Sequence, residues 1–356
     1  MAPNGQEKDV PLADEYTDTV LVAPQAGPRK YTIVYLTVLN FLYWHSGGFY
    51  GLYLCFTSAK WATIIFNTIL HVCAVWGITA GSHRLWAHRS YKAKLPLQIL
   101  LMLFHSLAFE NPAVHWARDH RLHHKYSDTD ADPHNATRGF FYSHVGWLLV
   151  RKHPEAIKRG RTIDVSDLYE NPVLQFQKKN YFYLSGLLTF ILPAIIPMYF
   201  WQESLNNAHH ISLLRLIAVL NVTFFVNSAA HRFGNKPYDK NMSPTQSVTL
   251  SLATLGECFH NYHHVFPFDY RTAELGNNYI NFTTKFIDFF VWIGWAYDLK
   301  QASEDMIVKR SNRTGDGTDL WGRVKEGCNN QTTKNIWGWG DKDMEEKQKN
   351  LLMNQK

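Results

Sequence analysis

The stretch His120-Arg121-Leu122-His123-His124 is the most informative part of this 356-residue sequence. On an α-helix, positions i, i+3 and i+4 lie on one face, so its three imidazoles would point in one direction. The same pattern returns at His260-Asn261-Tyr262-His263-His264, and His83 and His88 form a looser pair before both. These clustered histidines indicate a transition-metal site, because neutral imidazole is a common ligand of such metals.

The number of histidines suggests more than one metal ion. His231 ends an apolar stretch, one helical turn after Asn227, and would add a ninth imidazole. One ion takes about four to six ligands, so eight or nine imidazoles imply two ions. His83 and His88 would lie about 140° apart on an α-helix, so we expect this pair to flank a cavity rather than chelate one ion alone.

Four long apolar stretches indicate a membrane protein. Each approaches the roughly 20 residues needed to cross the hydrocarbon core of a bilayer, and they lie at 31–56, 61–80, 182–200 and 211–230. Lys60 is the only Lys or Arg in the two short connections between paired stretches, whereas residues 81–181 hold 15 of them. The positive-inside rule therefore places both termini and this central region in the cytosol.

The fold that follows is all-α. We expect a four-helix membrane domain with a cytosolic helical cap, formed by 81–181 and 231–317, that holds the histidine-rich site. The flanking segments 1–30 and 318–356 are polar, and we expect a cytosolic N-terminal segment and a solvated C-terminal tail.

Three further parts of the sequence have to be placed relative to the membrane. The apolar run 97–109 is short for a span, and the histidines on its two sides could not meet if it crossed, so we place it against the cytosolic face. The aromatic run 285–299 is interrupted by Asp288, which suggests an amphipathic helix at the interface. Arg215 lies near the start of the fourth stretch, and we expect its side chain to extend to the lumenal surface.

Other metal sites fit the sequence less well. The zinc-protease signature H-E-x-x-H is absent, and soluble di-iron bundles need two E-x-x-H motifs where Glu257 and His260 supply one. A haem held by two histidines would leave the paired histidines unexplained. Asp128, Asp130 and Asp132 have the spacing of a calcium loop, but Pro133 takes the place of its turn glycine. We expect ordinary core or surface roles for the remaining histidines: His45, His71, His105, His115, His134, His144, His153, His209 and His210.

A metal site beside lipid chains has little to hydrolyse and many C–H bonds to oxidise, which favours a redox metal and dioxygen. The order of the boxes and the strings around them resemble the integral-membrane acyl-CoA desaturases of the stearoyl-CoA type, most closely the insect members, including those of moths. The resemblance runs from about Tyr31 to Gly317. The matching strings are Gly77–Ser82, Trp116–Asp119, Ala131–Asn135, Val145–Pro154, Asn227–His231 and Phe266–Tyr270.

This resemblance implies two iron ions (Fe2+) between the membrane domain and the cap. The first iron would be held by His83, His88, His120, His124 and His263. The second would be held by His123, His231, His260 and His264, with Asn227 reaching it through water.

The resemblance also implies a fatty acyl-CoA substrate. Its head group and acyl linkage would contact Asn111, Arg118, Asp119, Arg151 and Lys152, and cations facing phosphates make physical sense. Two positions depart from the family: Thr37 stands where an asparagine is frequent and Phe224 where a tryptophan is, so we leave both out of the site.

The implied reaction is introduction of a double bond into the acyl chain, using dioxygen. The sequence has neither a G-x-G-x-x-G fingerprint nor a fused haem motif, so cytochrome b5 and its NADH-dependent reductase would supply electrons. The implied location is the endoplasmic reticulum membrane, with both termini in the cytosol and no nucleic-acid partner. A membrane di-iron fatty acyl hydroxylase or monooxygenase is the alternative, and a non-catalytic haem or metal carrier is a third possibility. Chain length, double-bond position and geometry, bifunctionality and oligomeric state are not determined.

Overall fold

The computed structural model describes residues 30–274, 280–319 and 321–324. These residues are mostly helical, which confirms the expected all-α class. One small antiparallel sheet pairs β1 (Lys92–Ala93) with β2 (Ala296–Tyr297). The expected terminal segments 1–30 and 318–356 fall almost wholly outside the described residues.

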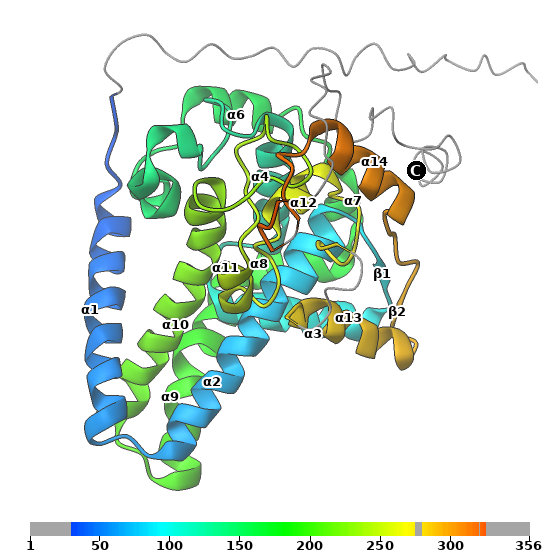
Figure 1. The fold of residues 1–356 in the computed structure, drawn as a ribbon. Helices are drawn as coiled ribbons and strands as arrows, with labels where there is room; N and C mark the ends of the chain where they lie inside the picture. Colours follow the sequence, from blue (N-terminus) through cyan, green and yellow to red (C-terminus); the bar gives the residue numbers. More distant parts are fainter. Residues whose placement is uncertain (1–29, 275–279, 320, 325–356) are drawn as a thin grey trace, which may run out of the picture.

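Long helices run side by side and form the elongated part of the molecule, and the cap helices gather at one end of them (Figure 1). The short connections at residues 58–60 and 202–204, which each join two long helices, lie at the opposite end. The long helices are α1 (Tyr35–Thr57), α2 (Trp61–Trp76) with η2 (Gly77–Ala87), α8 (Pro172–Gly186) with η5 (Leu187–Ile191) and α9 (Leu192–Trp201), and α10 (Leu205–Ser228) with η6 (Ala229–His231).

Three continuous helical stretches are long and apolar enough to cross a membrane: Trp61–Ala87, Pro172–Trp201 and Leu205–His231. The fourth expected span, α1, is less apolar but contains no charged residue. Its 23 residues would extend about 34 Å at 1.5 Å per residue. α1 packs against α10 and exposes large apolar side chains such as Leu36 and Phe56, which are 71% and 84% exposed. Such a surface suits lipid rather than water.

The helices extend beyond the apolar stretches that predicted them. The second expected span ends at residue 80, yet its helix continues to Ala87 and carries His83. The third is expected from residue 182, yet its helix begins at Pro172, where the Asn171 side chain accepts hydrogen bonds from the backbone of Val173 and Leu174. Apolar content marks the part of a helix that lies in lipid, whereas capping residues determine where the helix ends.

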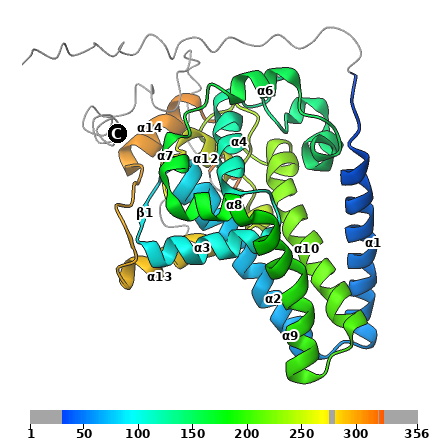
Figure 2. The ribbon, with the colours of Figure 1, turned by 180° about the vertical axis from the view of Figure 1, so that it is seen from behind.

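The run expected to lie against the cytosolic face forms α3 (Leu95–Ala108). It meets α4 (Ala113–Tyr126) at 82°. Figure 2 shows α3 lying crosswise to the long helices, and α13 (Phe282–Trp292) lies crosswise with it. The turn between α3 and α4 is tight, with positive φ at Phe109 and Asn111. A helix pair bent in this way is either a broken span or a re-entrant loop, and the placement of α3 against the cytosolic face stays a prediction.

The expectation for Arg215 is wrong. Its side chain is buried, and its guanidinium donates to the carbonyl oxygens of Leu107 and Thr189, each at 3.0 Å. Leu107 lies in the last turn of α3 and Thr189 in the π-helical η5, where carbonyl groups lack their usual α-helical partners. Arg215 satisfies these carbonyls inside the protein, so its side chain does not reach the lumenal surface.

The cap is built from short helices and loops, and its loops contain buried ion pairs. Arg310 lies 2.7 Å from Asp239, and Arg271 lies 2.6 Å from Asp269. The remaining helices are η3 (Ala136–Arg138), η4 (Tyr142–Gly146), α5 (Trp147–Leu149), α6 (Pro154–Gly160), α7 (Ser166–Glu170), α11 (Val248–Ala253), α12 (His260–Val265) and α14 (Glu304–Thr314).

Gly77 allows η2 to approach α3 closely, and this contact generates a prediction. A Cβ atom at Gly77 would overlap the backbone of Phe104 and His105. Gly77→Ala should therefore destabilise the protein by about 2 kcal/mol, because backbone cannot move aside cheaply. Gly186→Ala is the matched control: no atom lies within 4 Å of its Cβ position, so it should be neutral or stabilise by up to about 1 kcal/mol. Thermal unfolding in detergent measures both, and equal midpoints would contradict the close contact.

Candidate metal centre

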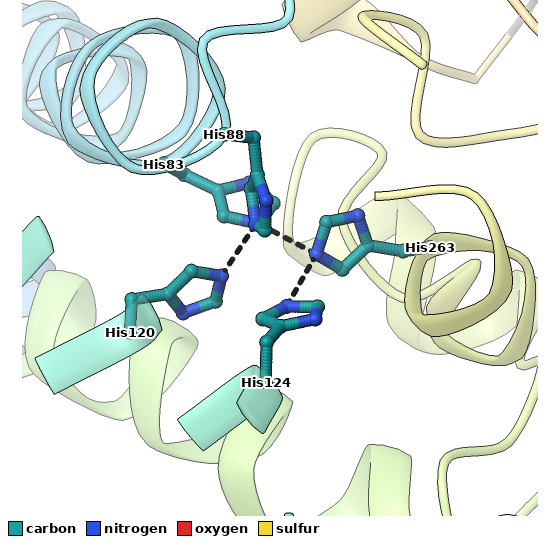
Figure 3. A group of neighbouring side chains, drawn as sticks. All are labelled: His83, His88, His120, His124 and His263. Atoms are coloured by element: carbon teal, nitrogen blue, oxygen red, sulfur yellow. Dashed lines mark hydrogen bonds between the residues drawn. The ribbon is translucent and has the colours of Figure 1, made fainter. Parts of the chain in front are cut away.

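All nine histidines of the predicted set come together in two adjacent groups. Within each group the candidate ligand atoms lie within 4.8 Å of one another. The first group joins η2, α4 and α12 and contains His83, His88, His120, His124 and His263, whose rings converge in Figure 3. The second group joins α4, η6 and α12 and contains His123, His231, His260 and His264.

The π-helix explains how His83 and His88 meet in one group with three other histidines, a pair that we expected to flank a cavity rather than chelate one ion alone. The backbone N–H of His88 donates to the carbonyl of His83 at 3.0 Å, the i to i+5 bond of a π-helix. This wider turn places residues five apart on one face, and the two ring centroids are 4.9 Å apart. The estimate of about 140° assumed an α-helix, so it fails at this segment.

The two H-x-x-H-H boxes are each divided between the groups. On α4, His120 and His124 belong to the first group and His123 to the second. On α12, His263 belongs to the first group, whereas His260 and His264 belong to the second. Adjacent histidines differ by about 100° around a helix, so each doublet can serve both groups. The rings of His124 and His264 stack with centroids 4.2 Å apart, which brings the two groups into contact.

The distances between facing nitrogens fit metal coordination. Imidazole nitrogens bind transition metals at about 2.1 Å, so two ligands at right angles lie about 3 Å apart. In the first group, Nε2 of His263 lies 3.0 Å from Nε2 of His83 and 2.9 Å from Nε2 of His124. In the second group, Nε2 of His260 lies 3.0 Å from Nε2 of His231 and 3.1 Å from Nε2 of His264. Each group can therefore hold a metal ion.

Burial keeps most of these imidazoles neutral, as metal binding requires. Loss of solvation is the main cause that lowers the pKa well below its ordinary value, and neighbouring histidines lower it further. A neutral ring has a free lone pair for a metal, whereas a protonated ring has none. The histidines affected in this way are His88, His120, His124, His260, His263 and His264.

Carboxylates that are buried or partly buried contact the Nδ1 atoms of three of the rings. Nδ1 of His83 lies 2.8 Å from Glu257, Nδ1 of His123 lies 2.9 Å from Asp132, and Nδ1 of His231 lies 3.2 Å from Asp128. Such partners fix ring orientation and make the far nitrogen a better ligand. Burial alone would raise the pKa of Glu257, but the charge of Arg84 and the contact with His83 lower it to about 2.

Sequence reasoning missed the part played by these carboxylates. Asp128 and Asp132 were considered only as a calcium loop, and Glu257 only as part of an E-x-x-H motif. The sequence shows that these carboxylates lie near the boxes. It does not show their pairings, because these can join segments far apart in the chain, as His83 and Glu257 do. His134, expected to be an ordinary histidine, also lies at the site: its ring packs on His123 with centroids 4.5 Å apart.

The expected substrate contacts lie on α4, on the turn before α4 and in the segment before α6. Asp119 accepts from Arg118 at 2.9 Å and pairs with Lys152, so these three form one charged cluster. Arg151 is exposed beside Lys152, and Asn111 lies exposed on the turn before α4. Asn227 is half-buried on α10, one turn before His231. The roles of these residues, including water-mediated binding by Asn227, stay predictions.

The carboxylate behind His123 generates a second prediction. Asp132→Asn keeps the size of the side chain but removes its charge, and loss of such a partner typically weakens metal binding by about 10- to 100-fold. We expect the purified variant to lose its metal at chelator concentrations that leave the unaltered protein loaded, as measured by elemental analysis. Asp305→Asn, on the exposed face of α14, is the control. Equal metal retention by both variants would show that Asp132 does not support the site.

Comparison with known proteins agrees with this geometry. Residues 58–276 match the family model described as fatty acid desaturase. The chain is 66% identical over 309 residues to an acyl-CoA Delta(11) desaturase of Spodoptera littoralis, covering 87% of this chain and 91% of that protein. It is 60% identical over 322 residues to an (11Z)-hexadec-11-enoyl-CoA conjugase of Bombyx mori, covering 89% and 98%. It is 50% identical over 296 residues to stearoyl-CoA desaturase 5 of Bos taurus, covering 83% and 88%. With this match to more than half of its length and these similarities across most of it, the chain belongs to the fatty acid desaturase family.

Proposed function

We propose that this protein is an acyl-CoA desaturase that introduces a double bond into a fatty acyl-CoA chain with dioxygen. The observation that carries the proposal is the meeting of nine histidines in two adjacent groups at the end of a membrane-spanning bundle. The relatives named above are desaturases and a conjugase, which favours desaturation over the hydroxylase alternative.

The two groups would each hold one Fe2+ ion. Five imidazoles would form the first site, and four imidazoles with Asn227 through water would form the second. Zinc would accept the same nitrogen donors but has no redox chemistry. When bound, iron supplies the redox chemistry that breaks unactivated C–H bonds with dioxygen.

The protein's own residues would position the chain and keep the site dry. The Trp116 ring stacks on the His120 ring with centroids 5.1 Å apart, so the indole covers one side of the first group. Most of the nine ligands are buried, and Leu122 and Tyr262 beside them are also buried. A site closed in this way selects which carbons meet the metals and excludes water from competing reactions.

The coenzyme A end of the substrate would lie on the cytosolic face. Arg118, Arg151 and Lys152 can pair with phosphates, whereas Asp119 holds Arg118 and Lys152 in place. Asn111 would add a polar contact near the acyl linkage from the turn before α4.

The proposed setting is the endoplasmic reticulum membrane, with both termini in the cytosol. Cytochrome b5 and its NADH-dependent reductase would deliver electrons to the cap side. The crosswise helix α13 would lie in the interface, since Phe289 and Trp292 on it are 52% and 80% exposed. This position agrees with the expected amphipathic helix, although α13 begins and ends earlier than the run 285–299.

Product analysis tests the proposal. Expression in desaturase-deficient yeast should yield unsaturated fatty acids, identified by mass spectrometry, and a hydroxy acid in their place would contradict desaturation. His231→Ala should reduce activity as severely as His123→Ala, by at least about 100-fold, because each removes one metal ligand. His209→Ala is the control: its ring bonds Tyr43 near the opposite end of the bundle, so it should keep activity.

Lys152 tests the head-group site separately. Lys152→Ala should raise KM for acyl-CoA by about tenfold, since a hydrogen bond to a charged group contributes about 1.5 kcal/mol or more. The value of kcat should change little, because such a contact binds substrate and transition state equally. Lys309→Ala, which makes the same charge change on the exposed side of α14, should leave KM unaltered. An unchanged KM in Lys152→Ala would remove Lys152 from the substrate site.

A further inference from the structure

Arg121 lies inside the second histidine box, but it is not a candidate ligand and the proposed reaction does not use it. It sits on α4 between His120 and Leu122, and its side chain is 13% exposed. A guanidinium has five N–H bonds that can donate. The Arg121 side chain makes five hydrogen bonds, all of 3.1 Å or less. A side chain satisfied in this way keeps one orientation and can fix the groups that it bonds.

Two of the five bonds reach the end of helix η2. Nε of Arg121 donates to the carbonyl oxygen of Ala87 at 3.1 Å, and a terminal nitrogen donates to that of Trp86 at 2.8 Å. Carbonyl groups in the last turn of a helix have no partner further along the helix, so they need a donor from elsewhere. His88 follows directly as the residue that ends η2. Arg121 therefore holds the backbone that leads into His88.

The other three bonds tie the same guanidinium to α7. One terminal nitrogen donates to the carbonyl oxygen of Asp164 at 2.7 Å. Both terminal nitrogens donate to the carboxylate of Asp167, at 2.8 and 2.7 Å, in the paired geometry that arginine forms with carboxylates. Burial alone would raise the pKa of Asp167, but the bonds and charges of Arg121 and Arg89 lower it. A charged partner on α7 thus anchors Arg121.

His88 depends on its backbone for orientation more than several other rings of the site do. Carboxylates contact the Nδ1 atoms of three other rings, whereas no carboxylate in the described part of the chain pairs with His88. The chain also turns immediately after it, because Arg89 has a positive φ of 51°. Even so, Nε2 of His88 lies 2.8 Å from Nε2 of His120 (Figure 3). The end of η2 must therefore be held in place.

Arg121 connects the two helices that supply most of the first group. Its own helix, α4, carries His120 and His124, and η2 carries His83 and leads into His88. The second group takes no residue from η2. A change that frees the end of η2 should therefore affect the first group and spare the second.

We propose that Arg121 is a positioning residue of the first group: by binding the carbonyls of Trp86 and Ala87, it ends η2 at the point where His88 faces His120. This inference rests on the proposed function, in which each group holds one iron ion. Without the planar guanidinium, the end of η2 is free to move and the first group loses a well-placed imidazole.

The main test is Arg121→Lys, which keeps the positive charge beside Asp167. An ammonium lacks the planar fork of a guanidinium, so it cannot bond the carboxylate and both carbonyls in this arrangement. Loss of a supporting contact of this kind typically weakens metal binding by about 10- to 100-fold. The purified, iron-loaded variant should lose one of its two ions at chelator concentrations that leave both in the unaltered protein, as measured by elemental analysis.

Arg89→Lys is the matched control, because it makes the same change beside His88. Arg89 is 47% exposed and bonds the Asp167 carboxylate at 2.9 and 2.8 Å, and no bond joins it to the Trp86 or Ala87 carbonyl among the described residues. This control should keep both ions. Equal metal loss in the two variants would overturn the inference, since pairing with Asp167 alone would then explain it.

Combined variants identify which ion is lost. Adding His83→Ala to Arg121→Lys should leave the remaining ion in place, whereas adding His260→Ala should remove it, because His260 belongs to the second group. Thermal midpoints show whether each variant folds. Retention of both ions by folded Arg121→Lys, or an ion that persists when His260→Ala is added, would overturn the inference.

Asp167→Asn gives a second measurement that does not depend on the folding of Arg121→Lys. It weakens the anchor of the guanidinium but leaves Arg121 in place, so the same ion should be lost to a smaller extent, by about tenfold in affinity. Unaltered iron retention in this variant would also contradict the inference. Failure of the unaltered protein to bind two ions, or to desaturate, would instead overturn the proposed function.

Discussion

The convergence of nine imidazoles is the constraint on which the rest of the structure depends. Their nitrogens face one another at 2.8 to 3.3 Å, a spacing that fits ligands of a shared metal ion. Carboxylates and one buried arginine hold the rings in place. Arg84 is fully buried and bonds Glu257 at 3.0 and 2.5 Å, and also the Tyr270 carbonyl and the hydroxyl of Thr284. This network joins η2 to the segments around α12 and α13, so cap and membrane helix form one unit.

The π-helix at Gly77–Ala87 is the local feature that makes this convergence possible. It carries the first histidine pair out of the membrane on a continuous helix and brings His83 and His88 to one face. The close contact of Gly77 with α3 holds the same segment from the other side. A regular α-helix would keep the chain continuous but turn one of the two histidines away, and the first group would lose a ligand.

The sequence predicted those parts of the protein that depend on local pattern. Apolar length identified the long helices, and i, i+3, i+4 spacing identified the boxes on α4 and α12. His83 precedes α3, whereas His120 and His263 follow it. Because these histidines must meet at one site, the sequence also predicted that α3 does not cross the membrane. The pairings of His83 with Glu257 and of His123 with Asp132 depend on how distant segments pack, and no spacing rule contains that information. Helix type at Gly77–Ala87 was missed for a related reason, because π-helices have no strong sequence signal.

The polar residues inside the membrane domain were the hardest to interpret from sequence, and Arg215 shows why. A charge in an apolar stretch is expected to reach the nearest surface, because burial in lipid is costly. The structure offers another solution: the end of α3 and the π-helical η5 leave carbonyl groups that need donors. Arg215 satisfies them and thereby fixes the end of α3 from which the turn to α4 begins. Irregular backbone in this domain leaves carbonyl groups without helical partners, and buried polar side chains donate to these carbonyls. The two features therefore occur together, since each satisfies the hydrogen-bonding groups of the other.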